Sequence, residues 1–394
     1  MTVSAATRQF INEHRHDNVR ELALQGRKYP DVDMPFAITQ IAGRQAAADK
    51  IPSWSATDGL LYPKHLSMEQ CSSEATATYK ASLLKGNTFA DLTGGFGIDC
   101  AFISRNFAKA VYVERQTELC DIAKHNFPVL GLNHIQVINS DGVEYLRQME
   151  ETDCIFLDPA RRNEHGGKTV AISDCEPDVA ELSPLLLSKA KRIMIKLSPM
   201  LDLSLALHDL PSTDEVHIVS VANECKELLL ILNKERKGEE VTIHCINIGK
   251  DNTQQKFSFT RKEEQEAACT YAVQTGGYLY EPNASILKAG AYRSIAKAYK
   301  LDKLHPNSHL YTSDAYISDF PGRIFRIENT FTLNKKEVKE HLQGTEKANI
   351  TVRNFPVTVA ELRKRLKLKD GGDIYLFATT LADERKVLIK CSKP

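Results

Sequence analysis

The chain has 394 residues, 42% of them hydrophobic, and its 51 Lys and Arg residues balance 51 Asp and Glu residues. This length predicts two or three domains, and the zero net charge gives no overall indication of a nucleic-acid or membrane partner. No run of 18 apolar residues and no signal-peptide core are present, so we expect no membrane association. The nine cysteines include no CxxC pair, which favours reduced thiols, a cytoplasmic location and no metal site.

Residues 1–70 are predicted to be a helical N-terminal region. FINEHRHDNVRELALQGRK and ITQIAGRQAAADK place apolar residues three and four positions apart, as on one face of a helix. A further helix is predicted in SSEATATYKASLL, where Ser72 or Ser73 can serve as the N-cap.

Residues 71–235 alternate between strand-like and helix-like segments. The strand-like runs, rich in β-branched and aromatic residues, are TFADL, AVYVE, IQVIN, CIFLD, RIMIKL, EVHIVSV and ELLLILN. Strands that alternate with helices predict an α/β domain with a doubly wound parallel sheet. The runs at 216–221 and 228–233 have no helix between them, so they predict a final antiparallel hairpin.

The remaining chain predicts two further regions. Residues 236–320 are expected to connect the domains through a hairpin, VTIHCINIGKDNTQQKFSFT, and a mostly helical segment from 265 to 310. Residues 321–394 predict the order β-α-β-α-β-β, a small α+β domain.

This last domain is basic, with 16 Lys and Arg residues against 9 Asp and Glu residues. Five of the cations lie in ELRKRLKLK: Arg363, Lys364, Arg365, Lys367 and Lys369. Such a surface can hold RNA through its phosphates, although the same pattern also fits a solvated helix face. Phe355 and Phe377 are the candidates for stacking on bases, and both also fit a hydrophobic core.

Each of the first four predicted strands of the α/β domain ends at or just before an acidic residue. These residues are Asp91, Glu114, Asp141 and Asp158. Ligands of doubly wound sheets bind at the carboxyl ends of the strands, so we expect the four acids to line one site. Gly94, Gly95 and Gly97 follow Asp91, and glycines there let the backbone approach a ligand closely.

The residues around this glycine turn distinguish two possible ligands. A nicotinamide fingerprint requires GxGxxG, but Cys100 occupies the position of the third glycine. An acid just before the glycines is unfavourable near a pyrophosphate, whereas it suits the ammonium and sulfonium groups of S-adenosylmethionine. We therefore predict S-adenosylmethionine as the cofactor, with Glu114 suited to its ribose hydroxyls.

In this order, DLTGGFG, VYVE, NSDG and LDPARR resemble the motifs of class I S-adenosylmethionine-dependent methyltransferases, over roughly residues 70–235. The resemblance implies a Rossmann-like fold in which Asp91 and the three glycines flank the methionine part. It also implies that Glu114 holds the ribose and Asp141 the adenine amino group. Gln70 is a further implied cofactor contact, because its segment is similar to the helix before the first strand in several RNA-modifying members.

A second resemblance extends over nearly the whole chain. QIAGRQAAADK, LDPARR, YLYEPNASILKAG and the basic C-terminal domain together resemble bacterial methyltransferases with a ferredoxin-like or THUMP-like C-terminal domain. This resemblance implies RNA as a partner but does not identify the substrate.

The stretch LDPARR predicts the chemistry. In N-methyltransferases of this class the fourth strand commonly ends in (Asp/Asn/Ser)-Pro-Pro-aromatic, where the acid and a backbone carbonyl accept hydrogens from the target amine. Asp158 and Pro159 match the first half of this motif, which implies that they position a nitrogen nucleophile. Ala160 replaces the second proline and Arg161 replaces the aromatic residue. Either the target is therefore not an exocyclic base amine, or the group that stacks on the base comes from elsewhere. Trp54 and Tyr62 are candidates, although Trp54 also fits a core position.

Three cations near these strand ends have more than one interpretation. Arg161 and Arg162 can bind a polyanionic substrate, because arginine suits phosphate, or they can pair with the acids at 174, 176 and 178, and a third possibility is that they only order the loop. Lys196, at the end of the fifth predicted strand, either lines the site or is solvated.

These features predict a methyltransferase that acts on a nitrogen of structured RNA, either rRNA or tRNA, with Asp158, Pro159 and Arg161 at the reacting centre. Two alternatives remain open. One is a methyltransferase for protein or a small molecule, and the other is a non-catalytic RNA-binding protein with a degenerate cofactor fold. The target atom and the oligomeric state are not predicted.

Overall fold

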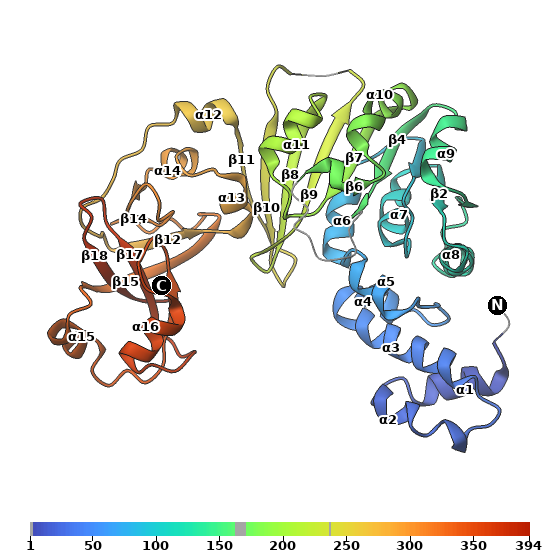
Figure 1. The fold of residues 1–394 in the computed structure, drawn as a ribbon, viewed down its shortest axis with the longest axis horizontal. Helices are drawn as coiled ribbons and strands as arrows, with labels where there is room; N and C mark the ends of the chain where they lie inside the picture. Colours follow the sequence, from blue (N-terminus) through green and yellow to red (C-terminus); the bar gives the residue numbers. More distant parts are fainter. Residues whose placement is uncertain (1–2, 162–170, 236–237) are drawn as a thin grey trace. The chain divides into compact units, whose positions relative to one another are not determined.

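A computed structural model describes residues 3–161, 171–235 and 238–394 (Figure 1). The chain forms two compact units. The first comprises residues 1–214 and 228–239, and the second comprises residues 215–227 and 240–394.

The first unit begins with helices, as the sequence predicts. They are α1 (Ala5–Glu13), α2 (Val19–Ala23), α3 (Met34–Lys50), α4 (Pro52–Ser55), α5 (His65–Gln70) and α6 (Glu74–Leu83), with a 3-10 turn at Gly26–Lys28. Polar side chains cap their N-termini: Ser4 accepts from a backbone N–H of α1, Asp33 from one of α3 and Ser73 from one of α6. The first three helices pack together through Phe10, Leu22, Ala37 and Ile41.

A mainly parallel sheet forms the rest of the first unit. This sheet has nine strands, and those that lie wholly or partly in the first unit include β1 (Thr88–Asp91), β2 (Lys109–Glu114), β3 (Ile135–Asn139), β4 (Thr152–Leu157), β7 (Ala190–Leu197) and β9 (Glu224–Asn233). They lie in the order β9-β7-β4-β1-β2-β3, with β9 antiparallel to β7 and every other neighbouring pair parallel. The strand order reverses at β1, which has β4 on one side and β2 on the other. Ligands of open α/β sheets bind at such a switch point.

Helices connect the parallel strands, as a doubly wound sheet requires (Figure 1). They are α7 (Ile98–Ile103), α8 (Thr117–Val129), α9 (Gly142–Gln148), α10 (Val179–Lys189) and α11 (Leu203–Asp209). Helix α8 contacts β2 and β3, α9 contacts β2, and α10 contacts β7. Two short strands, β5 (Ala160–Arg161) and β6 (Cys175–Glu176), pair with each other after β4.

Both predicted hairpins of the middle region are present. Strand β8 (Thr213–Val221) is joined to its neighbour β9 by Ala222 and Asn223, whose φ angles of 50° and 66° form a two-residue hairpin turn. Strands β10 (Thr242–Ile248) and β11 (Gln254–Thr260) are antiparallel, and β10 also pairs in parallel with β8.

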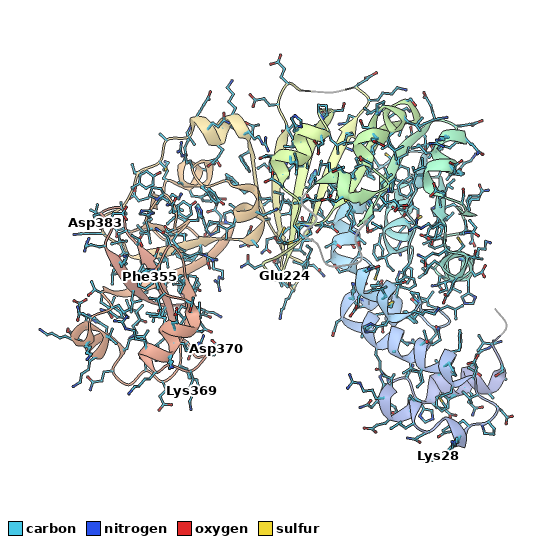
Figure 2. The ribbon with its side chains drawn as sticks, viewed as in Figure 1. Lys28, Glu224, Phe355, Lys369, Asp370 and Asp383 are labelled. Atoms are coloured by element: carbon cyan, nitrogen blue, oxygen red, sulfur yellow. The ribbon has the colours of Figure 1, made fainter. Side chains whose placement is uncertain are left out.

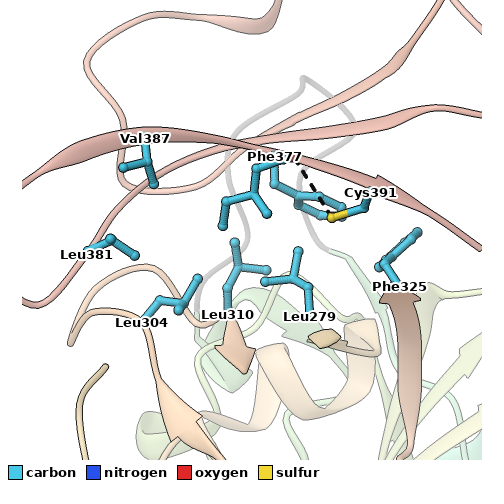
Figure 3. Close-up of a cluster of buried hydrophobic side chains, with 9 residues drawn as sticks. Leu279, Leu304, Leu310, Phe325, Phe377, Leu381, Val387 and Cys391 are labelled. Atoms are coloured by element: carbon cyan, nitrogen blue, oxygen red, sulfur yellow. Dashed lines mark hydrogen bonds between the residues drawn. The ribbon is translucent and has the colours of Figure 1, made fainter. Parts of the chain in front are cut away.

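A second sheet forms most of the second unit. Its order is β13-β14-β12-β15-β18-β17-β16, made by β12 (Tyr278–Pro282), β13 (Asp302–Lys303), β14 (Tyr311–Ser313), β15 (Gly322–Phe331), β16 (Asn349–Val352), β17 (Tyr375–Thr380) and β18 (Lys386–Ser392). The helices of this unit are α12 (Arg261–Glu266), α13 (Ala284–Ala289), α14 (Ser294–Tyr299), α15 (Lys335–Leu342) and α16 (Val359–Leu366). Residues 322–392 therefore have the predicted order β-α-β-α-β-β. Figure 3 shows part of the core, in which Phe325 and Phe377 pack with aliphatic side chains such as Leu279.

The segment from 265 to 310 differs from the sequence-based expectation. It was predicted to be mostly helical, but β12 and β13 lie within it and α13 and α14 are each only six residues long. The reason is long-range pairing: β12 lies between β14 and β15, so Leu279 and Tyr280 are buried in a sheet completed by residues far along the chain. A local periodicity does not contain that information.

The composition predicts neither a disulfide framework nor a membrane span. None of the nine cysteines is bonded to another in the structure. Across the described part of the chain, no helix is long and apolar enough to span a bilayer.

Candidate functional site

The end of β1 places a buried carboxylate beside an open stretch of backbone. Asp91 is 1% exposed and accepts a hydrogen bond from the Thr93 N–H at 3.0 Å. Gly95 has a φ of 53°, and a Cβ added there would lie 3.8 Å from the Thr93 carbonyl oxygen, its nearest neighbour. The backbone at Gly95 is therefore accessible to a ligand, in a conformation that favours glycine.

The other two glycines of the turn are required by packing. A Cβ at Gly94 would lie 2.3 Å from the ring of Tyr112, and one at Gly97 would lie 3.0 Å from the ring of Phe127. The Gly94 N–H also donates to the Val113 carbonyl at 2.8 Å, which attaches the turn to β2. The glycine pattern thus has two causes, and only Gly95 combines a positive φ with open space.

Glu114, at the end of β2, contacts this turn directly. Its side chain is 8% exposed, and Oε2 accepts from the Gly95 N–H at 2.9 Å while Oε1 accepts from the Gln116 N–H at 2.8 Å. Each carboxylate oxygen can accept more than one hydrogen bond. Glu114 is therefore held in a fixed orientation and retains the capacity to accept hydrogens from a pair of hydroxyls.

Asp141, which follows β3, has a structural role in addition to its predicted one. It is exposed, and its Oδ1 caps α9 by accepting from the N–H groups of Val143 and Glu144 at 2.8 and 3.1 Å. A Cβ at Gly142 would lie 2.1 Å from the Leu92 carbonyl oxygen, so the loops after β1 and β3 are in contact. This contact brings Asp141 to the same edge of the sheet as Asp91.

Asp158 is fixed at the end of β4 by two contacts. Its N–H donates to Thr93 Oγ1 at 2.7 Å, which connects it to the glycine turn. Its carboxylate, which is partly exposed, accepts a hydrogen bond from the Lys196 ammonium at the end of β7. The side chain of Lys196 is only 13% exposed, so this lysine lines the site and is not solvated.

A buried ionic network, which the sequence analysis did not identify, continues from this pair. The Lys196 ammonium is 3.9 Å from Asp99, and the fully buried Lys80 ammonium is 3.0 Å from the other oxygen of Asp99. Ser72 accepts from Lys80 at 2.9 Å and donates to Asp99 at 2.7 Å. The sequence signal was a charged residue inside each of two apolar helical stretches, TYKASLL and GIDCAFI.

The electrostatics of these acids differ. Burial raises the pKa of Asp91 well above its usual range, and the charges of Asp99, Asp158 and Glu114 raise it further. Burial acts on Asp99 too, but the Lys80 and Lys196 charges outweigh it and hold the pKa of Asp99 below its ordinary value. A cation bound beside Asp91 would offset the cost of its buried charge. The residues therefore fit a ligand that carries a positive charge and a pair of hydroxyls.

The aromatic candidates of the first unit belong to the core. Trp54 is 0% exposed and Tyr62 is 3% exposed, and the Tyr62 hydroxyl donates to the Trp54 carbonyl at 3.0 Å. Trp54 also packs edge-on against Phe96. Because both side chains are buried, neither is available to stack on a substrate in this conformation.

The remaining predicted residues are Gln70, Pro159, Arg161 and Arg162. Gln70 is exposed at the last position of α5, and Pro159 is buried directly after Asp158. The backbone of Arg161 belongs to β5, whereas its side chain and all of Arg162 lie outside the described residues. Glu176, considered as a partner for them, lies 3.4 Å from Arg115.

The basic surface of the second unit is carried by α16 and the loop after it. Leu362 is buried on one face, while Lys364, Arg365, Lys367 and Lys369 are exposed (Lys369 is labelled in Figure 2). Arg363 differs because it pairs with Asp370 at 2.7 Å. Of the two candidate stacking residues, Phe377 is 1% exposed and Phe355 is partly buried.

Three protein families match parts of the chain. Residues 74–173 match a family described as "Conserved hypothetical protein 95", residues 278–321 match a ferredoxin-like domain, and residues 322–393 match a THUMP domain-like family. A search of curated proteins returned no match.

One solved structure is similar over almost its entire length. It is described as a "putative methyltransferase from Porphyromonas gingivalis W83" and is 37% identical, with a TM-score of 0.89 over 98% of this chain and 97% of that one. An rRNA methylase from Streptococcus thermophilus is 14% identical over 40% of this chain and 94% of its own, with a TM-score of 0.31. A likeness this low carries no argument about function.

Proposed function

This chain belongs to the family of class I methyltransferases that includes the Porphyromonas gingivalis protein, and we propose that it methylates a nitrogen of structured RNA, either rRNA or tRNA, from S-adenosylmethionine. The observation that carries the proposal is the set of carboxylates Asp91, Glu114 and Asp158 around the open backbone of Gly95. They lie at the switch point of the sheet, where ligands of this architecture bind.

The cofactor would supply a methyl group already activated by its sulfonium. The buried carboxylate of Asp91 would lie near its positive charge, and Glu114 would accept hydrogens from the ribose hydroxyls. Asp141 would accept from the adenine amino group, and Gln70 would contact the cofactor from the end of α5. The raised pKa of Asp91 supports this arrangement, because a bound cation favours the charged carboxylate.

Asp158 and the Pro159 carbonyl would orient the nitrogen that receives the methyl group. A nitrogen whose hydrogens are held by two acceptors presents its lone pair in one direction, which is catalysis by positioning. The Lys196 contact supports this role, because it restricts the orientation of the Asp158 carboxylate, whose oxygens accept hydrogen bonds. We therefore propose Lys196 as a positioning residue.

The proposed RNA substrate rests on the basic surface of the second unit. Four exposed cations lie on or just after α16, in the part of the chain that matches a THUMP domain-like family. Cations on such a surface contact phosphates and position a strand without reading its sequence. Arg161 follows Asp158 by three residues in the sequence, and we propose that it contributes a cation to the reacting centre.

Transfer of labelled methyl from S-adenosylmethionine tests the proposal. The acceptors are total RNA and total protein, taken separately from cells that lack this chain. We expect label in a single size class of RNA. Label in protein alone would contradict the RNA substrate and leave the basic domain as a scaffold. If neither is labelled but S-adenosylhomocysteine still binds, a small-molecule substrate would be the better interpretation.

Variants separate the role of Asp158 from that of cofactor binding. Asp158→Ala is expected to abolish transfer and Lys196→Met to lower it, while both still bind S-adenosylhomocysteine. Asp121→Asn, at an exposed position of α8, is the matched control and should keep full activity. Full transfer activity in Asp158→Ala would refute the role assigned to Asp158. If the wild-type chain does not bind S-adenosylhomocysteine, the better interpretation would be a non-catalytic RNA-binding protein with a degenerate cofactor fold.

A further inference from the structure

Three side chains with metal-binding atoms lie together on one sheet face of the second unit, and methyl transfer does not use them. Glu215 and His217 are two residues apart on β8, and successive strand residues alternate between faces, so both project from the same face. His244 on β10 is the direct register partner of His217. Neighbouring strands lie about 4.8 Å apart, which brings the third side chain within reach of the other two.

The distances among these groups approach those of a metal site. His217 Nε2 is 3.3 Å from Glu215 Oε2, and one ligand atom from each of the three residues lies within 4.8 Å of the others. Two ligands bound to tetrahedral zinc at their normal bond lengths lie about 3.3 Å apart. One edge of the tetrahedron therefore already has the right length, and the others need side-chain movements of at most about 1.5 Å.

The two histidine rings are held by their surroundings. They stack with centroids 4.6 Å apart and an interplanar angle of 24°. His244 Nδ1 is 2.8 Å from Ser258 Oγ, and Ser258 is the register partner of His244 on β11. Metal-binding histidines usually make such a contact through the ring nitrogen that does not bind the metal. This hydrogen bond leaves Nε2 of His244 as its ligand atom.

The three candidate ligands are buried or partly buried. His217 is 4% exposed, and Glu215 and His244 are partly buried. Imidazole nitrogens and carboxylate oxygens in such a partly enclosed position are ligands that divalent transition-metal ions accept in proteins.

We propose that Glu215, His217 and His244 bind a divalent transition-metal ion, foremost zinc, which links β8 to β10. Two imidazole nitrogens and one carboxylate oxygen are ligands that zinc accepts in proteins, and three protein ligands leave one tetrahedral position for water. The expectation of no metal site followed from the absence of CxxC pairs. The absence of CxxC pairs does not exclude a site formed by strand pairing, which here brings together His217 and His244, 27 positions apart in the sequence.

The test is metal binding by the full-length chain after removal of metals with a chelator. Zinc content is measured after equilibrium dialysis, and cobalt(II) is added in a parallel experiment because its visible spectrum reports the ligands. We expect one equivalent per chain without the sulfur-to-cobalt charge-transfer absorption that would mark binding by cysteines. His244→Asn and His217→Ala should lose this equivalent. Ser258→Ala should keep it with an affinity reduced about 10- to 100-fold.

Two further variants serve as a control for nonspecific binding by histidines and as a replacement if His217→Ala does not fold. His208→Ala, at an exposed histidine of α11, is the matched control and should bind like the wild type. If His217→Ala does not fold, Glu215→Gln supplies a milder test: zinc should raise the melting temperature of the wild type but not of this variant. The proposal is wrong if the wild type binds no such equivalent, or if His244→Asn and Glu215→Gln both retain it.

Discussion

Two groups of charged residues, one in each unit, lie in opposite environments. In the first unit Lys80, Asp99 and Asp91 are buried, whereas in the second unit four cations on or just after α16 are exposed: Lys364, Arg365, Lys367 and Lys369. A buried charge requires a partner, and removal of that partner leaves an uncompensated ion. An exposed charge contributes little to stability and remains available for phosphates. The same residue types therefore affect folding in one unit, and we propose that they bind the cofactor there and the substrate in the other unit.

The strongest test of this comparison is removal of the buried lysine. Lys80→Met leaves Asp99 in the interior without its closest cation and should destabilise the first unit by about 3–5 kcal/mol. The exposed Lys369→Met is the control, with an expected change within about 0.5 kcal/mol. Urea denaturation of both variants measures the difference. Equal stability of the two variants would mean that water reaches Asp99.

The glycine turn allows packing to be separated from ligand access. Gly94→Ala places a methyl group against the Tyr112 ring and should destabilise the chain by about 1–3 kcal/mol. Gly95→Ala costs about 1–2 kcal/mol for its positive φ but places its methyl group where we expect the cofactor. Isothermal titration with S-adenosylhomocysteine should show the greater loss of affinity for Gly95→Ala. The reverse ranking would move the cofactor away from this turn.

Asp91 should oppose stability while supporting cofactor binding. Its pKa is raised in the folded chain, so the folded state binds the proton more tightly and stability falls as the pH rises through that raised value. Asp91→Asn should therefore be more stable than the wild type at neutral pH and bind S-adenosylhomocysteine more weakly. The stability difference should disappear at acidic pH. Thermal unfolding across a pH series measures it, and a less stable Asp91→Asn at neutral pH would contradict the prediction.

The smallest effect on stability is expected at the basic surface. The double variant Lys364→Gln/Arg365→Gln should change the free energy of unfolding by less than about 0.5 kcal/mol per site. RNA binding should weaken. The plot of the logarithm of the association constant against the logarithm of the salt concentration should become less steep, by about 0.7 for each lost contact to a single-stranded phosphate. Arg27→Gln/Lys28→Gln, an exposed pair in the first unit, is the charge-matched control. Equal losses in both variants would show that RNA responds only to total charge.

The sequence was sufficient to predict those features that depend on residues close together in the chain. The alternation of strands and helices in 71–235 and the order β-α-β-α-β-β at the C-terminus were predicted and confirmed. The motif DLTGGFG also indicated a tight turn after β1, because glycines with positive φ have few substitutes. The assignment of site residues to a cofactor stays a prediction.

Other features followed only from the tertiary structure. The burial of Lys80, its pairing with Asp99 and the contact between Lys196 and Asp158 join residues from four separate segments. The strand β12 was missed because its partners lie far along the chain, and the cluster of Glu215, His217 and His244 exists only because β8 pairs with β10.

The sequence by itself thus determined the fold class, the glycine turn and the row of acids at the strand ends, because local periodicity and strand alternation encode them. Only the tertiary structure decided which charges are buried, which cations pair with them and which distant side chains become neighbours. The physical reason is that burial and pairing depend on long-range packing, and packing sets the energetic consequence of every charge.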